Sequence, residues 1–355
     1  MLKFLSSSRI TVICLFLLFV LTFWGTIAQV QQGLYVAQER FFNSFFFLAA
    51  GVIPFPGAQL VLWVLFINLM AMMMTSLQKL SRLENVGLLI IHVGLILYFF
   101  AAFMVFHVYK ESNVHLTQGQ GTNISASYTE WELAYWTSEG HERQVIAIDT
   151  TDFKPGYSIP FTTHDFTVSV DQFYLNSDEI DEPNAKMQLV PKAVDREREQ
   201  NIQSGIFNIK SQGQSHALTL YGAEGRPTAL SLGGQKYYFI LRHKRFELPF
   251  TIRLKSFKAE FHPGTQIAKS FESMVTLTTA GLQRQVRIYM NNPLRYKDYT
   301  VYQASYDTDQ EGRQYSTLAV VKNFARVLPY IACFVVFFGL ALHFLIQAFM
   351  AKGRL

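Results

Sequence analysis

The segment GLLIIHVGLILYFFAAFMVFHV (87–108) contains no Asp, Glu, Lys or Arg, and its interior holds one imidazole, that of His92. About 20 consecutive apolar residues are enough for a helix to cross the hydrocarbon core of a membrane. Three further segments meet this condition, namely Ile10–Ala28, Ala58–Leu77 and Val327–Phe349. The sequence therefore predicts four transmembrane helices.

The overall composition also indicates a membrane protein. Half of the 355 residues are hydrophobic, 32 are Phe, and 16% are charged, which is too apolar for a soluble chain of this length. Another apolar run, FFNSFFFLAAGVIPFPG (41–57), is interrupted by Pro54, Pro56 and Gly57, so we predict an interfacial helix lying along the membrane. The first span is interpreted as a helix because no convincing signal-peptide cleavage site follows it.

Positively charged residues predict the side of the membrane on which each flank lies, because Lys and Arg in short flanks favour the cytoplasmic side. They occur at both ends of the chain and in the loop 78–86: Lys3, Arg9, Lys79, Arg82, Lys352 and Arg354. Both termini and this loop are therefore predicted to be cytoplasmic, with the region 110–325 outside. The formal net charge of +5 then reflects the basic residues of the cytoplasmic flanks. No nucleic-acid partner is predicted, because the outer region lacks an overall basic excess.

The region 110–325 has the alternating pattern of β-strands. FTVSVDQFYL (166–175) and QVRIYM (285–290) place apolar residues at every second position. We predict a large extracytoplasmic all-β, sandwich-like domain over 110–325, preceded by three spans (10–28, 58–77, 87–108) within 1–109 and followed by the fourth span and tail, 326–355. The polar segment 181–205 is typical of a linker. Two subdomains split near 181–205 and one sheet system with an inserted loop both fit.

Several stretches together resemble one protein family. WGTIAQ (24–29) ends the first span, LPFTIRLKSFKAEF (248–261) lies in the β region, and NNPLRYKDYTVYQASY (291–306) ends it. With the helix layout, they resemble the ResB family of cytochrome c biogenesis proteins, also called the CcsB type. The resemblance covers most of the chain and is strongest at 248–307.

The resemblance implies a role in system II cytochrome c biogenesis. Members of this family pair with a ResC/CcsA-type membrane subunit in the bacterial inner membrane. Together they carry haem b outward and present it for attachment to the CxxCH motifs of apocytochrome c. A histidine in the third span is taken to bind the haem iron, and His92 occupies that place. The tryptophan-rich haem-handling motif belongs to the partner, and the four Trp residues here form no such motif.

The histidines of the spans are the candidate haem ligands. An imidazole inside a membrane is costly, so it usually faces a bundle interior or marks a site, and a neutral imidazole is a common axial ligand of haem iron. The alternative is a packed histidine that is hydrogen-bonded to a neighbouring helix. At 1.5 Å per residue, His92 and His343 lie about 8 and about 9 Å from the same membrane edge. A shared haem is then geometrically compatible with the sequence.

Helical direction separates these candidates. Gly87, Gly94 and Ala101 repeat every seven residues and form a small-residue seam, and His92 falls nearly opposite to it. We therefore favour His92 as a metal ligand of haem iron together with a histidine of the partner, with His343 as the second candidate. His107, together with His115, is a candidate outer haem station.

Other polar residues have simpler interpretations. The run RHKR (242–245) is read as a solvated charged strand more readily than as a propionate site, and Asn68 as an interhelical hydrogen bond. The run MAMMM (70–74) offers thioethers, although Met is more often a flexible packing residue.

The predicted function is that of a haem-holding and apocytochrome-docking subunit. No acid–base or nucleophile constellation is present, so this chain is expected to be an accessory subunit of a cytochrome c haem lyase (synthase), which acts by positioning. The alternative is a membrane-tethered β-domain scaffold or sensor without a cofactor.

Overall fold

The computed structural model describes residues 2–137, 144–159, 166–180, 187–265, 268–308 and 314–352. The chain forms two compact units. The membrane unit comprises Met1–Lys110, Tyr296–Tyr299 and Lys322–Leu355, and the sheet unit comprises Glu111–Arg295 and Thr300–Val321. Of the residues used for the topology prediction, Arg354 lies outside the described residues, as do residues 181–186 of the predicted linker.

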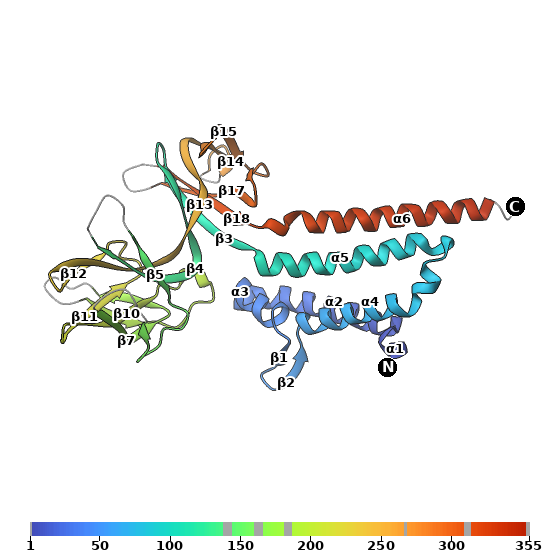
Figure 1. Cartoon of the computed structure of the whole chain (residues 1–355), viewed down its shortest axis with the longest axis horizontal. Coiled ribbons are helices and arrows are strands. Elements are labelled where there is room, and N and C mark those ends of the chain that lie inside the picture. Colours follow the sequence, from blue (N-terminus) through green and yellow to red (C-terminus); the bar gives the residue numbers. More distant parts are fainter. Residues whose placement is uncertain are drawn as a thin grey trace. The chain divides into compact units, whose positions relative to one another are not determined.

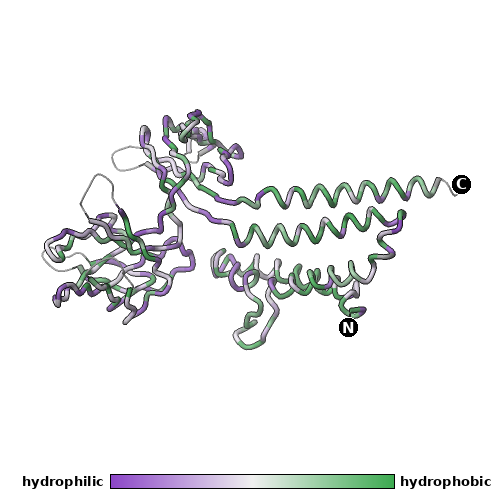
Figure 2. Tube along the Cα trace, in the orientation of Figure 1, coloured by the Kyte–Doolittle hydropathy of each residue, from purple (hydrophilic) through white to green (hydrophobic). Residues whose placement is uncertain are grey.

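The membrane unit contains four long helices, shown in Figure 1. They are α2 (Ser8–Gln32), α4 (Ala58–Leu80), α5 (Val86–Val108) and α6 (Leu328–Lys352). All four are long and apolar enough to cross a membrane, and Figure 2 shows their hydrophobic residues along each trace. The prediction of four spans is confirmed, and the chain is a multi-pass membrane protein. Short helical turns complete the unit: α1 (Leu2–Leu5), α3 (Leu34–Ala37), η1 (Gln38–Phe42), η2 (Leu83–Asn85) and η4 (Phe324–Val327).

Helices α5 and α6 pack closely through the predicted small-residue seam. Gly87, Gly94 and Ala101 are buried. A Cβ added to Gly87 would lie 2.5 Å from the Cα of His343, so the two backbones are in contact at this level. From the other side, a Cβ on Gly339 would lie 2.8 Å from the backbone nitrogen of Ile91. Because glycine has no side chain, α5 and α6 can approach each other closely, as helices with small residues at their interface do in membranes.

Helices α2 and α4 are joined near the chain's start by a buried amide. The hydroxyl of Thr11 donates a hydrogen bond to Oδ1 of Asn68 at 2.6 Å, and Nδ2 of Asn68 donates to the carbonyl oxygens of Leu5 and Ser7. Asn68 is 2% exposed. The predicted interhelical hydrogen bond is confirmed, and these bonds satisfy the amide where water is scarce.

The prediction of a helix over 41–57 is wrong, because this segment forms a β-hairpin. Strands β1 (Phe46–Ala49) and β2 (Ile53–Pro56) pair antiparallel. The turn between them includes Ala50 and Gly51, both with positive φ. Proline removes a backbone donor and ends helices, but edge strands tolerate it. The inner side of the hairpin packs on α2, where the Trp24 ring lies 5.6 Å from that of Phe47, centroid to centroid.

The sheet unit is built of antiparallel strands. The main sheet has ten strands in the path β15-β14-β13-β4-β3-β18-β17-β16, with β12 on β13 and β5 on β4. A four-stranded sheet has the order β11-β10-β7-β6, and β8 pairs with β9. The strands are β3 (Lys110–Thr117), β4 (Gly121–Thr137), β5 (Ile146–Asp149), β6 (Ser158–Ile159), β7 (Phe166–Tyr174), β8 (Ser177–Ile180), β9 (Gln188–Pro191), β10 (Ser204–Ser211), β11 (Gln214–Tyr221), β12 (Thr228–Leu232), β13 (Gln235–Phe261), β14 (Ala268–Thr279), β15 (Leu282–Tyr289), β16 (Leu294–Tyr296), β17 (Tyr299–Thr308) and β18 (Gln314–Lys322), with a turn η3 (Arg198–Gln200).

The sheets pack face to face around an aromatic core. Side chains of β4 and β13, including Tyr135 and Phe239, pack with β7 and β10 residues such as Val168 and Phe207. This arrangement agrees with the predicted sandwich-like β domain. Strand β13 is 27 residues long and passes through both halves of the unit, pairing with β4 and then also with β14. Its register against β14 shifts between Leu254 and Ser256.

Candidate functional site

The imidazole of His92 is held in one tautomer by its own helix. Its Nδ1 lies 2.7 Å from the carbonyl oxygen of Leu88, one turn earlier. A carbonyl oxygen can only accept, so Nδ1 carries the proton and donates it. In the neutral ring, Nε2 then keeps its lone pair and is free to bind a metal. Metal-binding histidines commonly have this arrangement, in which a backbone carbonyl orients the ring.

The His92 side chain lies on the face of α5 opposite to α6. Successive residues of a helix turn by about 100°, so His92 shares a face with Phe99 and Phe103, seven and eleven residues later. Those two rings contact α4: Phe99 lies 5.6 Å from Phe66 and Phe103 lies 6.4 Å from Trp63, between ring centroids. His92 is half-buried on a face that is flanked by aromatic rings.

His343 lies on the other side of α5. Its backbone packs against Gly87, five residues before His92, which corresponds to about 7.5 Å of helix rise. Its Nδ1 is buried and has no hydrogen-bond partner among the described residues. The structure therefore does not bring His343 and His92 together, because the α5 backbone stands between their faces. A partnerless buried nitrogen is costly, and His343 remains a candidate ligand for a separate group.

His107 repeats the arrangement of His92 near the end of α5. Its Nδ1 lies 2.8 Å from the carbonyl oxygen of Phe103, so its Nε2 is also free, and its ring stacks on Phe103 at 4.1 Å between centroids. The side chain is exposed. Fifteen residues separate His107 from His92, about 22 Å of helix rise, so the two cannot bind one iron.

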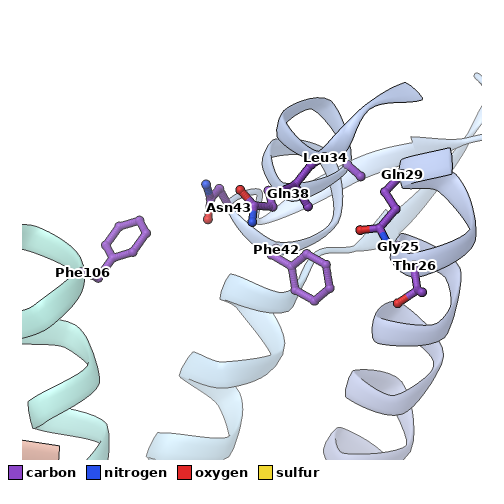
Figure 3. Close-up of a pocket in the computed structure, with 9 residues that line it drawn as sticks. Gly25, Thr26, Gln29, Leu34, Gln38, Phe42, Asn43 and Phe106 are labelled. Atoms are coloured by element: carbon purple, nitrogen blue, oxygen red, sulfur yellow. The ribbon is translucent and has the colours of Figure 1, made fainter. Parts of the chain in front are cut away.

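A pocket of about 540 Å³ opens beside this end of α5. Figure 3 shows that Phe106 lines it from α5, whereas the other labelled side chains come from α2 and the turns that follow it. Polar atoms from Thr26, Gln29, Gln38 and Asn43 share the lining with Phe42 and Leu34. No sequence pattern predicted this pocket, because its residues come together only when the chain turns back after α2 through α3 and η1.

The run RHKR (242–245) is largely neutralised within the sheet unit. Arg242 donates to Glu132 at 2.8 Å in a buried ion pair, and Lys244 donates to Asp149 at 2.6 Å. His243 stacks on its cross-strand neighbour Trp131, with ring centroids 4.1 Å apart, and burial lowers the pKa of its imidazole. The run lies on a charged strand as predicted, but Arg242 and His243 are largely buried, so the expectation of a solvated strand is wrong for these two residues.

His115 belongs to the sheet unit and does not extend the α5 series. Its Nδ1 lies 2.9 Å from the hydroxyl of Thr317, and burial of the imidazole lowers its pKa. His107 and His115 are in different compact units. Of the two histidines of the predicted outer haem station, only His107 therefore has a described place on α5.

The residues of the His92 face have the chemistry that a haem requires. The ring nitrogen Nε2 is available, Leu88 determines the tautomer, and Phe99 and Phe103 lie two and three turns farther along the same face of α5. Sequence reasoning identified His92 from its ionisable ring. It did not identify the contacts of Phe99 with Phe66 and of Phe103 with Trp63, because aromatic residues are abundant in all four spans.

Comparison with known proteins finds a family match for part of the sheet unit. A model of the ResB-like family matches residues 231–312, which run from the end of β12 to just beyond β17. This part of the chain is similar to the ResB-like family. The sequence resemblance, strongest at 248–307, is confirmed by this match.

Two further likenesses accompany this match. Protein NrfI of Wolinella succinogenes is 30% identical over 95 residues, which are 26% of this chain and 10% of that protein. This chain therefore spans a small fraction of the relative that it matches. A solved structure titled Cytochrome c Heme Lyase CcmF is 11% identical and covers 93% of this chain and 34% of its own, with a TM-score of 0.21. A likeness at that score carries no argument.

Proposed function

We propose that this chain is the haem-holding subunit of a system II cytochrome c synthase, with His92 as an axial ligand of haem b. Similarity to the ResB-like family supports a role in cytochrome c biogenesis. The observation that carries the proposal is the Nδ1–Leu88 hydrogen bond, which leaves Nε2 free on a half-buried, aromatic-flanked face of a membrane helix.

The other parts of the proposal follow from the family and the charge pattern. A ResC/CcsA-type membrane subunit is the partner that receives the haem. The sheet unit faces the periplasm, with the helices in the bacterial inner membrane, and its open strand edges bind unfolded apocytochrome c by strand addition. Edge strands β15 and β11 are available for this because each pairs on one side in the described sheets. The attachment reaction then depends on orientation of haem and cysteines.

The experiment is an absorption spectrum of the chain purified in mild detergent with its partner. The wild-type complex is expected to show a Soret band, and His92→Ala is expected to lose or shift it. His343→Ala is the matched control, because His343 is a second membrane histidine on the opposite side of α5. Loss of the band in His343→Ala but not in His92→Ala would refute the ligand assignment. A colourless wild-type complex that still supports cytochrome c maturation would favour the cofactor-free scaffold.

A further inference from the structure

The β1–β2 hairpin of the membrane unit is apolar on both of its sides. Residues 45–57 read FFFLAAGVIPFPG, and none of their side chains carries a hydroxyl, an amide or a charge. One side of the hairpin packs on α2, as described above. The other side is exposed, with Phe46 at 63%, Val52 at 75% and Ile53 at 60% of their possible surface. A contiguous apolar surface of this kind indicates contact with a membrane or with another protein.

The contacts with α2 determine the level of the hairpin along this span. The ring of Trp24 lies 5.6 Å from that of Phe47 and 5.7 Å from that of Phe55, between centroids. The apolar run of α2 ends at Ala28, four residues after Trp24, which corresponds to about 6 Å of helix rise. Figure 1 shows the hairpin projecting sideways from α2 and α4, on the side away from α5. The hairpin therefore extends along the membrane plane at a depth that interfacial elements reach, about 5–10 Å.

The free edge of β2 lacks two of the backbone donors that lipid could not satisfy. Gly57 donates its N–H to the carbonyl oxygen of Phe45 at 2.8 Å, so these two residues form a hydrogen-bonded pair. Hydrogen-bonded and non-hydrogen-bonded pairs alternate along an antiparallel ladder. By the register of the hairpin, Pro54 and Pro56 are in non-hydrogen-bonded pairs, where the backbone nitrogen points outward. Proline carries no N–H at these positions, so no donor is left unsatisfied there.

The opposite edge, along β1, is partly satisfied by an arginine. Nη2 of Arg40 donates a hydrogen bond to the carbonyl oxygen of Leu48 at 2.8 Å. This bond agrees with the alternation, because Leu48 is the partner of Pro54 and its carbonyl group points away from β2. The Arg40 guanidinium also lies 5.5 Å from the ring centroids of Phe41 and Phe47, where cation–π attraction stabilises its charge. Both edges thus have features that lower the cost of leaving water.

We propose that the β1–β2 hairpin is an interfacial lipid-binding element, which lies in the leaflet that contains the C-terminal end of α2 and contacts acyl chains with its exposed side. Lipid is favoured over a protein that adds a strand, because strand addition to β2 would need the donors that Pro54 and Pro56 lack. Because the hairpin connects the end of α2 to the start of α4, its contact with lipid sets the depth of both helices. This inference does not depend on the haem assignment.

The test uses spin labels on the full chain in vesicles of phosphatidylethanolamine and phosphatidylglycerol. Cys14→Ala and Cys333→Ala first remove the two native thiols. Val52→Cys or Ile53→Cys then carries a nitroxide, and both positions are exposed enough to accept a label without repacking. Electron paramagnetic resonance measures the collisions of the label with oxygen, which partitions into lipid, and with a water-soluble nickel chelate.

Two further labels serve as matched references. Phe19→Cys lies on an exposed side of α2 within the span, and Leu282→Cys lies on an exposed position of the sheet unit. We expect both hairpin labels to have an oxygen-to-nickel collision ratio well above that of Leu282→Cys and approaching that of Phe19→Cys. A ratio equal to that of Leu282→Cys would place the hairpin in water and overturn the proposal. Hairpin labels that neither reagent reaches would overturn it as well, because a partner subunit or a second copy of the chain would then cover the hairpin.

Discussion

Helices α5 and α6 approach each other closely at Gly87, and substitution of Gly87 to Ala tests this contact. The added Cβ would lie 2.5 Å from the Cα, Cβ and backbone nitrogen of His343. Carbon atoms in contact lie about 3.5–4.0 Å apart, so α5 and α6 must separate locally by about 1 Å. Overpacking of a core lowers the free energy of unfolding by about 1–3 kcal/mol, and the better helix propensity of Ala relative to Gly raises it by up to about 1 kcal/mol. We expect a net loss of about 1–2 kcal/mol, given the rigid neighbour.

The assay is titration with SDS from mild detergent, followed by the helical band in far-ultraviolet circular dichroism. Gly94→Ala should cost less than Gly87→Ala, because its nearest neighbour is a Val336 methyl group at 2.7 Å that can rotate away. Ala102→Ile, on an exposed face of α5, is the control and should stay within about 0.5 kcal/mol of wild type. A Gly87→Ala variant as stable as wild type, or more stable, would refute close packing of α5 on α6.

Two further predictions concern the sheet unit. Glu132→Gln leaves the buried guanidinium of Arg242 without its counter-charge, so we expect the free energy of unfolding, measured with heat or urea, to fall by about 3 kcal/mol. The control Glu260→Gln removes a charge from an exposed pair and should change nothing measurable. Equal effects of the two substitutions would contradict the burial of the Arg242–Glu132 pair. Burial lowers the pKa of His243 below its unfolded value of about 6.5, so the unfolded chain binds more protons between the two values. Stability should therefore fall as pH drops below about 6.5, and His243→Phe should make this pH dependence shallower; a steeper one would disprove the assigned shift.

The sequence predicted the parts of the fold that depend on local patterns. Four apolar runs of sufficient length gave the four spans, and the seven-residue spacing of Gly87, Gly94 and Ala101 gave the seam that packs on α6. The polar amide of Asn68 inside an apolar helix required a partner and found Thr11. In each case, the feature depends on one or two residues, either on a polar group that needs a partner or on a small side chain that allows two helices to approach.

The parts that failed depend on long-range packing. The run 41–57 has the apolar composition of an interfacial helix, and its hairpin is defined by contacts with Trp24 and by a turn at Ala50 and Gly51. Likewise, the contacts of Phe99 and Phe103 with α4 follow from the register of α4 against α5, which no periodicity within one helix contains. The pairing of β13 with both β4 and β14 depends on the order of the strands in the sheet. The alternation of apolar and polar residues within one strand does not reveal that order.

The account depends most on His92 as an iron ligand, and rescue of a cavity variant tests that role directly. His92→Gly removes the ring and leaves the α5 backbone and its seam unchanged, so added imidazole can enter the vacated space. We expect the purified variant to lose the Soret band of the wild type and to regain it when imidazole and haemin are added. A variant that keeps the wild-type spectrum without imidazole would contradict the assignment, as would a variant whose band imidazole does not restore although the protein is folded.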